Sequence, residues 1–243
     1  MPKFFEDDLE ENKEIYDIQG ENAKHISYAL RHKVGDNITL CDKKGNDFDC
    51  TIIKFSEKSV QVRIDSVIKN QCEPDIKVSL FQSLLKGDKM EEVIQKSVEL
   101  GVYEIYPVLT SRCISKPDKN FDKKIERYNK ISLEAAKQCG RGIIPKVHNV
   151  ITYKEMLSKM RKSDTAMILY ESEKDIHIKE YLENKNPKSI AVGIGCEGGF
   201  SQEEIEKAKE ENIESISLGK RILRAQTAPV CALSCIMYES GNL

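Results

Sequence analysis

The sequence predicts an α/β protein in which a small antiparallel β-domain precedes a larger domain built on a parallel sheet. Up to Ile68, short apolar runs with a period of two residues alternate with turn-forming residues. After Pro74, strand-like runs alternate with helical patterns, as in a parallel sheet covered by helices. The stretch from Lys69 to Pro74 has turn composition and no apolar pattern. We therefore expect two domains, at residues 1–72 and 73–243.

The elements of the first domain follow from its apolar runs. Strands are expected at Asn37–Cys41, Phe48–Phe55 and Ser59–Val67, because turn residues separate these runs. Ahead of them, Glu21–Arg31 carries apolar residues at helical spacing. The first domain should thus be a small antiparallel barrel or meander with one helix.

The second domain should alternate between strand and helix as far as the C-terminus. Ser201-Gln-Glu-Glu204 is a capping box, so a helix should begin directly after the glycine-rich stretch. Pro229 is tolerated in the first turn of the last helix. The predicted elements are, in order, Lys77–Leu85, Lys89–Leu100, Glu104–Leu109, Asn120–Cys139, Tyr153–Arg161, Thr165–Tyr170, Ser189–Ile194, Ser215–Leu218 and a helix from about Pro229 to Tyr238.

Composition narrows the class of protein. With 32% charged residues and no long apolar run, the chain is expected to have no membrane span. The N-terminus carries no signal-peptide pattern, which favours the cytoplasm. The eight cysteines form no Cys-x-x-Cys pair and the four histidines are scattered. We therefore expect free thiols and no metal.

The charge distribution is more informative than the net charge of −2. Residues 1–72 hold 11 Lys/Arg against 14 Asp/Glu, whereas Arg112 to Lys146 hold 10 against 4. A basic segment of this kind can face phosphate, or it can be an ordinary solvated helix surface. Both interpretations stay open.

A glycine loop follows the predicted strand Ser189–Ile194. Gly193-x-Gly195-x-x-Gly198 matches the dinucleotide fingerprint in letters, but only 45 residues follow it and no acidic residue stands in Leu218–Arg221, where the ribose would need one. We therefore reject a nicotinamide-dependent oxidoreductase. A second interpretation is that the glycines serve only a tight strand-to-helix turn. A second loop, at Leu218–Ala228, follows another late strand, and two such loops at strand carboxyl ends favour a ligand site.

The second loop carries a family resemblance. Leu218-Gly-Lys-Arg-Ile-Leu-Arg-Ala-Gln-Thr-Ala228 resembles the C-terminal signature of SPOUT methyltransferases, and the match extends over nearly the whole chain to the RsmE family of small-subunit (16S) ribosomal RNA uracil-N3 methyltransferases. The other stretches that carry it are Lys86–Val102, Ser111-Arg-Cys113, Glu134–Arg141 and, near the N-terminus, His25–Arg31.

The resemblance implies a fold, a reaction and partners. It implies a SPOUT-type parallel sheet with a C-terminal trefoil knot, preceded by a PUA-like β-barrel that binds RNA, in a homodimer. The implied reaction is methylation of N3 of one uridine in 16S ribosomal RNA, with S-adenosylmethionine as the sole cofactor. The alternatives are a non-catalytic RNA-binding SPOUT protein and a methyltransferase that acts on another RNA base.

The two loops are expected to hold S-adenosylmethionine. Glycines let backbone groups approach the adenine and ribose, while aliphatic side chains line an apolar slot, although the same aliphatics would suit a core equally well. The expected cofactor-binding residues are Leu169, Ile194, Gly195, Glu197, Gly198, Gly199, Leu218, Gly219, Ile222, Leu223, Thr227 and Ala228.

The chemistry requires that uracil N3–H lose its proton before the nitrogen attacks. Arg224 is expected to stabilise the resulting anion. Glu197 can act as the base or can bond backbone amides, and solvent can also take the proton. Two residues depart from the family pattern: Cys196 stands where proline is usual, and Gln226 where glutamate is usual. A cysteine that adds to the ring for C5 methylation is the rival interpretation of Cys196, which we disfavour.

RNA contacts are expected on both domains. Most of them should touch phosphate and so fix position rather than sequence, although each residue alone could be an ordinary surface charge. The expected residues are Arg31, His32, Lys86, Lys89, Arg112, Lys137, Arg141 and Arg221.

Overall fold

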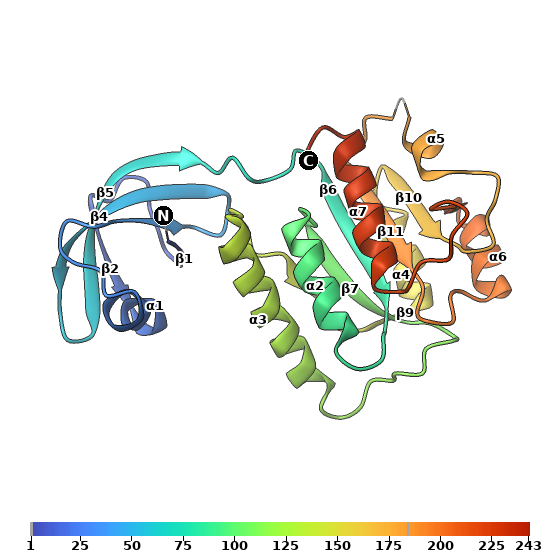
Figure 1. Cartoon of the computed structure of the whole chain (residues 1–243), viewed down its shortest axis with the longest axis horizontal. Coiled ribbons are helices and arrows are strands. Elements are labelled where there is room, and N and C mark those ends of the chain that lie inside the picture. The colour runs from blue at the N-terminus through green and yellow to red at the C-terminus, as the bar shows by residue number, and fades with distance from the viewer. Residues whose placement is uncertain (1, 184) are drawn as a thin grey trace. The chain divides into compact units, whose positions relative to one another are not determined.

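The structure is a computed structural model that describes residues 2–183 and 185–243. The chain divides into two compact units (Figure 1). The first unit contains residues 2–73 together with Ala136–Ile144, and the second contains Pro74–Ala135 and the rest of the chain from Pro145. The contribution of Ala136–Ile144 to the first unit was not expected from the sequence.

The first unit is a curled sheet, a half-barrel. Its strands are β1 (Lys3–Phe5), β2 (Ile15–Gln19), β3 (Asn37–Cys41), β4 (Asn46–Phe55) and β5 (Ser59–Lys69), in the order β1-β3-β4-β5-β2. All neighbours pair antiparallel except β1 and β3, which are parallel. The three expected strands are therefore confirmed, while β1 makes the sheet mixed. Alternate side chains, such as Phe48, Cys50 and Ile52 on β4, point into its core.

The helix expected at Glu21–Arg31 ends earlier than expected, and its second half has π-helical turns, which are wider than those of an α-helix. It begins as α1 (Gly20–Lys24) and continues as a π-helical turn, η1 (His25–Ala29). The amide of Leu30 donates to His25 O (2.9 Å), five residues back, and Arg31 adopts a left-handed backbone with φ of 55°. That conformation ends the helix.

The second unit is a parallel sheet between helices. Its order is β12-β10-β11-β6-β7-β8, with β9 also on β7, and every pair is parallel. The strands are β6 (Lys77–Ser83), β7 (Glu104–Leu109), β8 (Lys146–Val147), β9 (Ile151–Thr152), β10 (Thr165–Leu169), β11 (Ser189–Ile194) and β12 (Glu214–Ile216). The sheet confirms the expected architecture of this domain.

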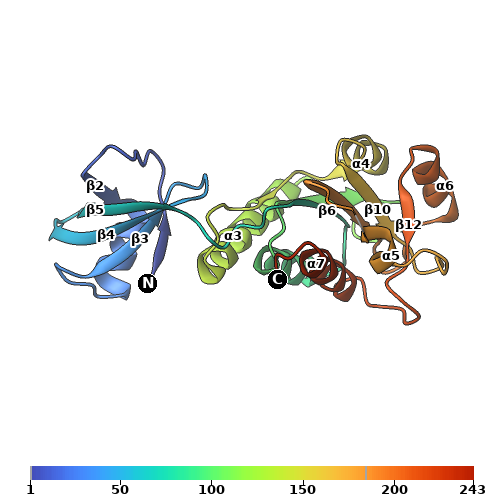
Figure 2. The same cartoon turned by 90° about the horizontal axis from the view of Figure 1, so that it is seen from above.

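Helices cover both faces of this sheet. Figure 2 shows α4 and α6 on one face and α7 on the other, where α7 packs against α2. The capping box at Ser201 is confirmed: its hydroxyl accepts the amide of Glu204 and starts α6. The helices are α2 (Lys89–Glu99), α3 (Phe121–Cys139), α4 (Tyr153–Met160), α5 (Ile178–Leu182), α6 (Gln202–Glu210) and α7 (Thr227–Glu239). In the part of the chain described, none is both long and apolar enough to cross a membrane.

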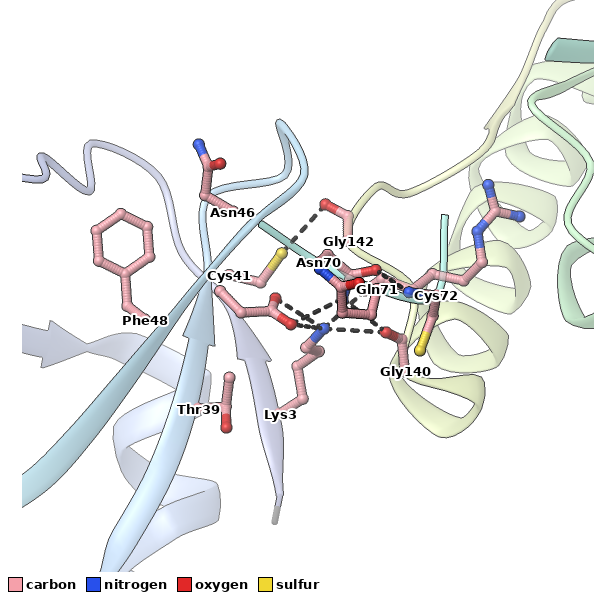
Figure 3. A network of polar contacts seen from close by, with 12 residues as sticks. Lys3, Thr39, Cys41, Asn46, Phe48, Asn70, Gln71, Cys72, Gly140 and Gly142 are labelled. Carbon is pink, nitrogen blue, oxygen red and sulfur yellow. Dashed lines mark hydrogen bonds and ion pairs between the residues drawn. The ribbon is translucent and has the colours of Figure 1, made fainter. Parts of the chain in front are cut away.

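A polar network joins Ala136–Ile144, the segment in which the chain returns to the first unit, to the rest of that unit (Figure 3). We call Ala136–Ile144 the returning segment. The Lys3 ammonium donates to Asp47 (2.8 Å) and to Gly140 O (3.0 Å), and the thiol of Cys41 donates to Gly142 O (3.1 Å). Asn70 donates to the same Asp47 carboxylate (2.7 Å). These contacts explain why Ala136–Ile144 belongs to this unit.

Arg141 corrects one expectation. Its side chain is only 3% exposed, and its guanidinium donates through two nitrogens to Glu73, at 2.9 and 2.8 Å. The same carboxylate accepts the amides of Gly142 and Ile143. Arg141 thus forms a buried ion pair within the first unit and is not a surface charge that can contact RNA phosphate.

Candidate active site

A cavity of about 460 Å³ opens at the carboxyl ends of β10, β11 and β12. Ligands in parallel α/β sheets bind at such ends, because the loops that follow the strands converge there. The cavity is lined by Lys89 and by residues of three chain segments, 169–171, 194–199 and 217–228. Both loops singled out in the sequence therefore meet at one cavity.

The glycine loop is folded tightly on itself. The amide of Gly199 donates to Cys196 O (2.9 Å), and Gly199 has a φ of 67°. A side chain on Gly195 would come within 2.9 Å of the Gly199 backbone, and one on Gly199 would collide with the Glu171 carboxylate. The loop consequently needs glycine at these two positions, and its backbone lies open to the cavity.

Neighbouring segments brace the glycine loop. The buried carboxylate of Glu204, in the first turn of α6, accepts the amide of Ser111 (2.8 Å), and the Arg112 guanidinium donates to Gly198 O (2.8 Å). The Ser111–Cys113 stretch therefore lies against the loop. From below, the fully buried Gln82 of β6 donates to Gly195 O (3.3 Å).

Glu197 is tied to the start of α2. Its carboxylate accepts the Lys89 ammonium (2.8 Å) and the amide of Lys86 (3.2 Å). Burial alone would raise the pKa of Glu197, but these hydrogen bonds outweigh it and hold the pKa below its usual value. Such a carboxylate stays ionised and is a poor proton acceptor, so its geometry favours the amide-bonding role over the basic one.

Arg224 lies on the wall formed by the second loop. Its backbone carbonyl accepts the amides of Thr227 and Ala228 (2.8 and 3.0 Å), which closes the turn into α7. Its side chain is exposed and makes no hydrogen bond or ion pair within the described residues, so the guanidinium is available to a ligand. Gln226 also lines the cavity and supplies an amide there rather than a carboxylate.

Cys196 faces the cavity but is poorly suited to nucleophilic attack. Its thiol is buried and shares a hydrogen bond with Cys113, and both this bond and burial raise the pKa of Cys196. Cys113 accepts that bond and another from Thr110, and these bonds lower the pKa of Cys113. Because the thiolate is the nucleophile, a protonated Cys196 argues against C5 chemistry.

The cavity contains most of the predicted cofactor residues. Of that set, Thr227 alone is absent from the lining, since it is exposed in the first turn of α7. Lys89 and Arg221, expected to contact RNA, also line the cavity. Sequence reasoning missed Tyr170, Glu171, Ser217, Lys220 and Ala225. Tyr170 ends the predicted strand at Thr165–Tyr170 and Glu171 directly follows it, and this position at a strand end should have marked both.

The remaining predicted RNA-binding residues stay at or near the surface. Lys86, Arg112 and Arg31 are exposed, whereas His32 and Lys137 are half-buried. Within residues 2–183 and 185–243, no three His, Cys, Asp or Glu side chains gather as a metal site.

Comparisons with known proteins first identify the class of protein to which the chain belongs. A family model described as an RNA methyltransferase domain matches residues 72–237, and one described as an RNA methyltransferase PUA domain matches residues 18–65. The chain is therefore a two-part RNA methyltransferase by family.

Individual relatives then define the family. The chain is 35% identical over 239 residues to ribosomal RNA small subunit methyltransferase E of Bacillus subtilis, covering 96% of this chain and 93% of that protein. It is 32% identical to the enzyme of the same name from Buchnera aphidicola, at 98% and 93% coverage. A crystal structure of the Neisseria gonorrhoeae protein of this name, bound to S-adenosyl methionine, superimposes with a TM-score of 0.88 at 30% identity, covering 98% and 97%. The chain belongs to the ribosomal RNA small subunit methyltransferase E family.

Proposed function

We propose that this protein transfers a methyl group from S-adenosylmethionine to N3 of one uridine in 16S ribosomal RNA, in the cytoplasm. The observation that carries the proposal is the cavity whose lining combines the glycine loop with the exposed side chain of Arg224. The name of the Neisseria relative and the cofactor in its structure support the same assignment.

The residues fit S-adenosylmethionine. Gly195 and Gly199 line the cavity at positions where a side chain would collide with neighbouring atoms, and Leu169 and Ile194 provide apolar walls for the adenine. When bound, the cofactor supplies a methyl group on a sulfonium, which needs an aligned nucleophile rather than a metal. The chain's own part is to bind, orient and exclude water.

Arg224 is proposed as the catalytic cation. Its charge, placed beside the uracil, lowers the pKa of N3–H and stabilises the anion spread over both carbonyl oxygens. The proton leaves to solvent, because the hydrogen bonds from Lys89 and from the Lys86 amide lower the pKa of Glu197 and so weaken this carboxylate as a base. The nitrogen lone pair then forms the new N–CH₃ bond while the S–CH₃ bond breaks, and the sulfur keeps that electron pair.

We also infer that the C-terminal loop forms a trefoil knot.

We further infer that two copies of the chain pair through α7. The support for pairing is a row of half-buried side chains with helical spacing on α7, at Val230, Cys231, Ser234 and Cys235. Val230→Arg should convert a dimer to a monomer in multi-angle light scattering, whereas Glu239→Arg at the exposed end of the same helix should not. A monomeric wild type would contradict the inference.

The deciding experiment is nucleoside mass spectrometry of ribosomal RNA from a deletion strain. We expect one N3-methyluridine to disappear from 16S RNA and to return with the wild-type gene. Persistence of that nucleoside would refute the proposal.

A non-catalytic RNA-binding protein is the second candidate, because Gln226 brings no carboxylate into the cavity. Purified protein that binds both S-adenosylmethionine and small-subunit RNA but yields no methylated nucleoside would favour it.

A further inference from the structure

Tyr28 stands out on the first unit as an aromatic side chain without a partner. It is 73% exposed and lies in the π-helical turn η1, whose only buried residue is Ile26. No ring contact or hydrogen bond of the Tyr28 side chain is found within the described residues. Leu30 and Val34 are exposed beside it in sequence, at 41% and 62%. Exposed apolar groups clustered in this way mark interaction surfaces more often than isolated ones do.

The same segment is basic within an otherwise acidic unit. Between Glu21 and Asp36 there is no acidic residue, whereas Lys24, Arg31 and Lys33 are all exposed. Asp36 is itself occupied, since its carboxylate accepts the amide of Lys33 (2.8 Å) and contacts His32 Nδ1 (3.0 Å). The segment 22–35 therefore places three exposed cations and no acidic residue of its own around Tyr28 in the sequence, which complements phosphate.

The backbone conformation displays Tyr28 between these cations. Lys24 lies four residues before Tyr28 in the same helical stretch, and Arg31 lies three residues after it, just beyond the end of that stretch, so both cations are close to Tyr28 along the chain. Arg31 carries a left-handed backbone, φ 55°, although it is not glycine. The Nε2 atom of His32 is buried without a hydrogen-bond partner among the described residues. π-turns and backbone strain of this kind concentrate at functional sites.

We propose that Tyr28 is a stacking platform for an unpaired base of the RNA substrate, with Lys24, Arg31 and Lys33 receiving the flanking phosphates. An aromatic ring among cations is the arrangement by which proteins hold single-stranded nucleic acid, whereas duplex RNA keeps its bases stacked on one another. The proposal takes RNA as the ligand and so rests on the proposed function. It adds the segment and the conformation of the RNA that are recognised.

The absence of tryptophan from the chain makes a direct test possible. The Tyr28→Trp variant has a single tryptophan at the proposed contact, and Tyr238→Trp has one at a matched position, since Tyr238 is also 73% exposed. Short single-stranded oligouridine should quench the fluorescence of Tyr28→Trp. Duplex RNA of the same length and an abasic oligomer should not quench it, and Tyr238→Trp should stay unquenched throughout.

Affinity provides the second half of the test. Tyr28→Ala should weaken oligouridine binding by roughly one order of magnitude, and Tyr28→Phe should restore it, because stacking needs the ring and not the hydroxyl. Quenching without a loss of affinity, a loss without quenching, or equal quenching by the abasic oligomer would each overturn the stacking platform.

Failure of this inference and failure of the proposed function are distinguishable. If only the stacking platform is wrong, wild-type protein still methylates small-subunit RNA while Tyr28→Trp shows no base-dependent quenching. If only the proposed reaction is wrong, the quenching pattern stands while no N3-methyluridine forms.

Discussion

At the scale of single residues, Gln82 shows how a buried polar group can serve a loop rather than the core. Its side chain is fully buried in β6, and its amide nitrogen reaches Gly195 O and Ser83 O. Its Oε1 atom has no partner among the described residues. The unsatisfied buried oxygen costs folding free energy, while the same side chain fixes the backbone that should face the cofactor.

The Gln82→Met substitution tests that role. It keeps the volume but removes the hydrogen bond to Gly195, so we expect the Kd for S-adenosylmethionine to rise roughly fivefold, about 1 kcal/mol, with little change in unfolding free energy. Calorimetry and urea unfolding measure the two quantities. Ser97→Ala, at another buried polar side chain that has no partner in the described part of the chain, should change neither. An unaltered Kd in Gln82→Met would show that Gly195 is held by other contacts.

Arg224 gives a prediction about pH. If its charge lowers the pKa of uracil N3–H, Arg224→Gln should reduce kcat by about a hundredfold near neutral pH. The deficit should shrink at alkaline pH, where uracil loses its proton unaided, and the affinity for S-adenosylmethionine should be unchanged. A pH-independent loss would assign Arg224 to positioning instead.

The sequence predicts which residues lie at strand ends and helix caps, because these patterns are local. It does not predict ion-pair partners that are distant along the chain. The capping box at Ser201 and the loop of Gly195 are local patterns, and both were predicted correctly. Arg141 looked like one cation in a basic stretch, because its partner Glu73 lies 68 residues away and only folding brings the two together.

At the scale of elements, the tie between Arg141 and Glu73 should determine the stability of the first unit. Arg141→Ala leaves the carboxylate with backbone donors only, and we expect unfolding free energy to fall by about 3 kcal/mol or more. Arg127→Ala, in an exposed pair with Glu91, should cost less than about 1 kcal/mol. Urea unfolding compares the two, and equal effects would contradict the structural role given to Arg141.

The Glu104 carboxylate, on β7 next to β8, should make the unfolding free energy of the second unit fall at acid pH. Burial alone would raise the pKa of Glu104, but hydrogen bonds from His148 (2.7 Å), Ser79 and Tyr106 outweigh it and lower that pKa. Since the carboxylate is stabilised in the folded state, its contribution is present above the ordinary glutamate pKa and is lost as pH falls through the folded value.

Glu104→Gln should therefore flatten the dependence of unfolding free energy on pH in the acid range, relative to the wild type. Thermal or urea unfolding at a series of acidic pH values measures it. An identical pH dependence in the two proteins would mean that other carboxylates dominate.

The helix at the start of the first unit shows the limit of periodicity at this scale. Spacing in Glu21–Arg31 correctly indicated a helix, yet it could not distinguish α from π turns. The five-residue hydrogen bond at Leu30 and the left-handed Arg31 depend on how Ile26 packs into the core, which is a tertiary effect.

At the scale of the whole molecule, the alternation of strands and helices after Pro74 predicted the parallel sheet, because each period is a local property of the sequence. Strand order was beyond such patterns. The neighbours of β11, namely β6 and β10, come from different parts of the chain, and their pairing is decided by packing. The division into units was visible at Lys69–Pro74 but not at Ala136–Ile144, whose membership depends on contacts with Lys3 and Cys41.

That returning segment affects how this protein can be cut or recombined. The chain passes from one unit to the other at three points, so no single cleavage releases the first unit intact. A fragment that stops at Glu73 lacks the carbonyls of Gly140 and Gly142, and leaves Lys3 and Cys41 without those acceptors. Residues 2–73 are therefore not an independent domain. A gene fusion that moved them alone would transfer an incomplete fold, so the two units are expected to be transferred together.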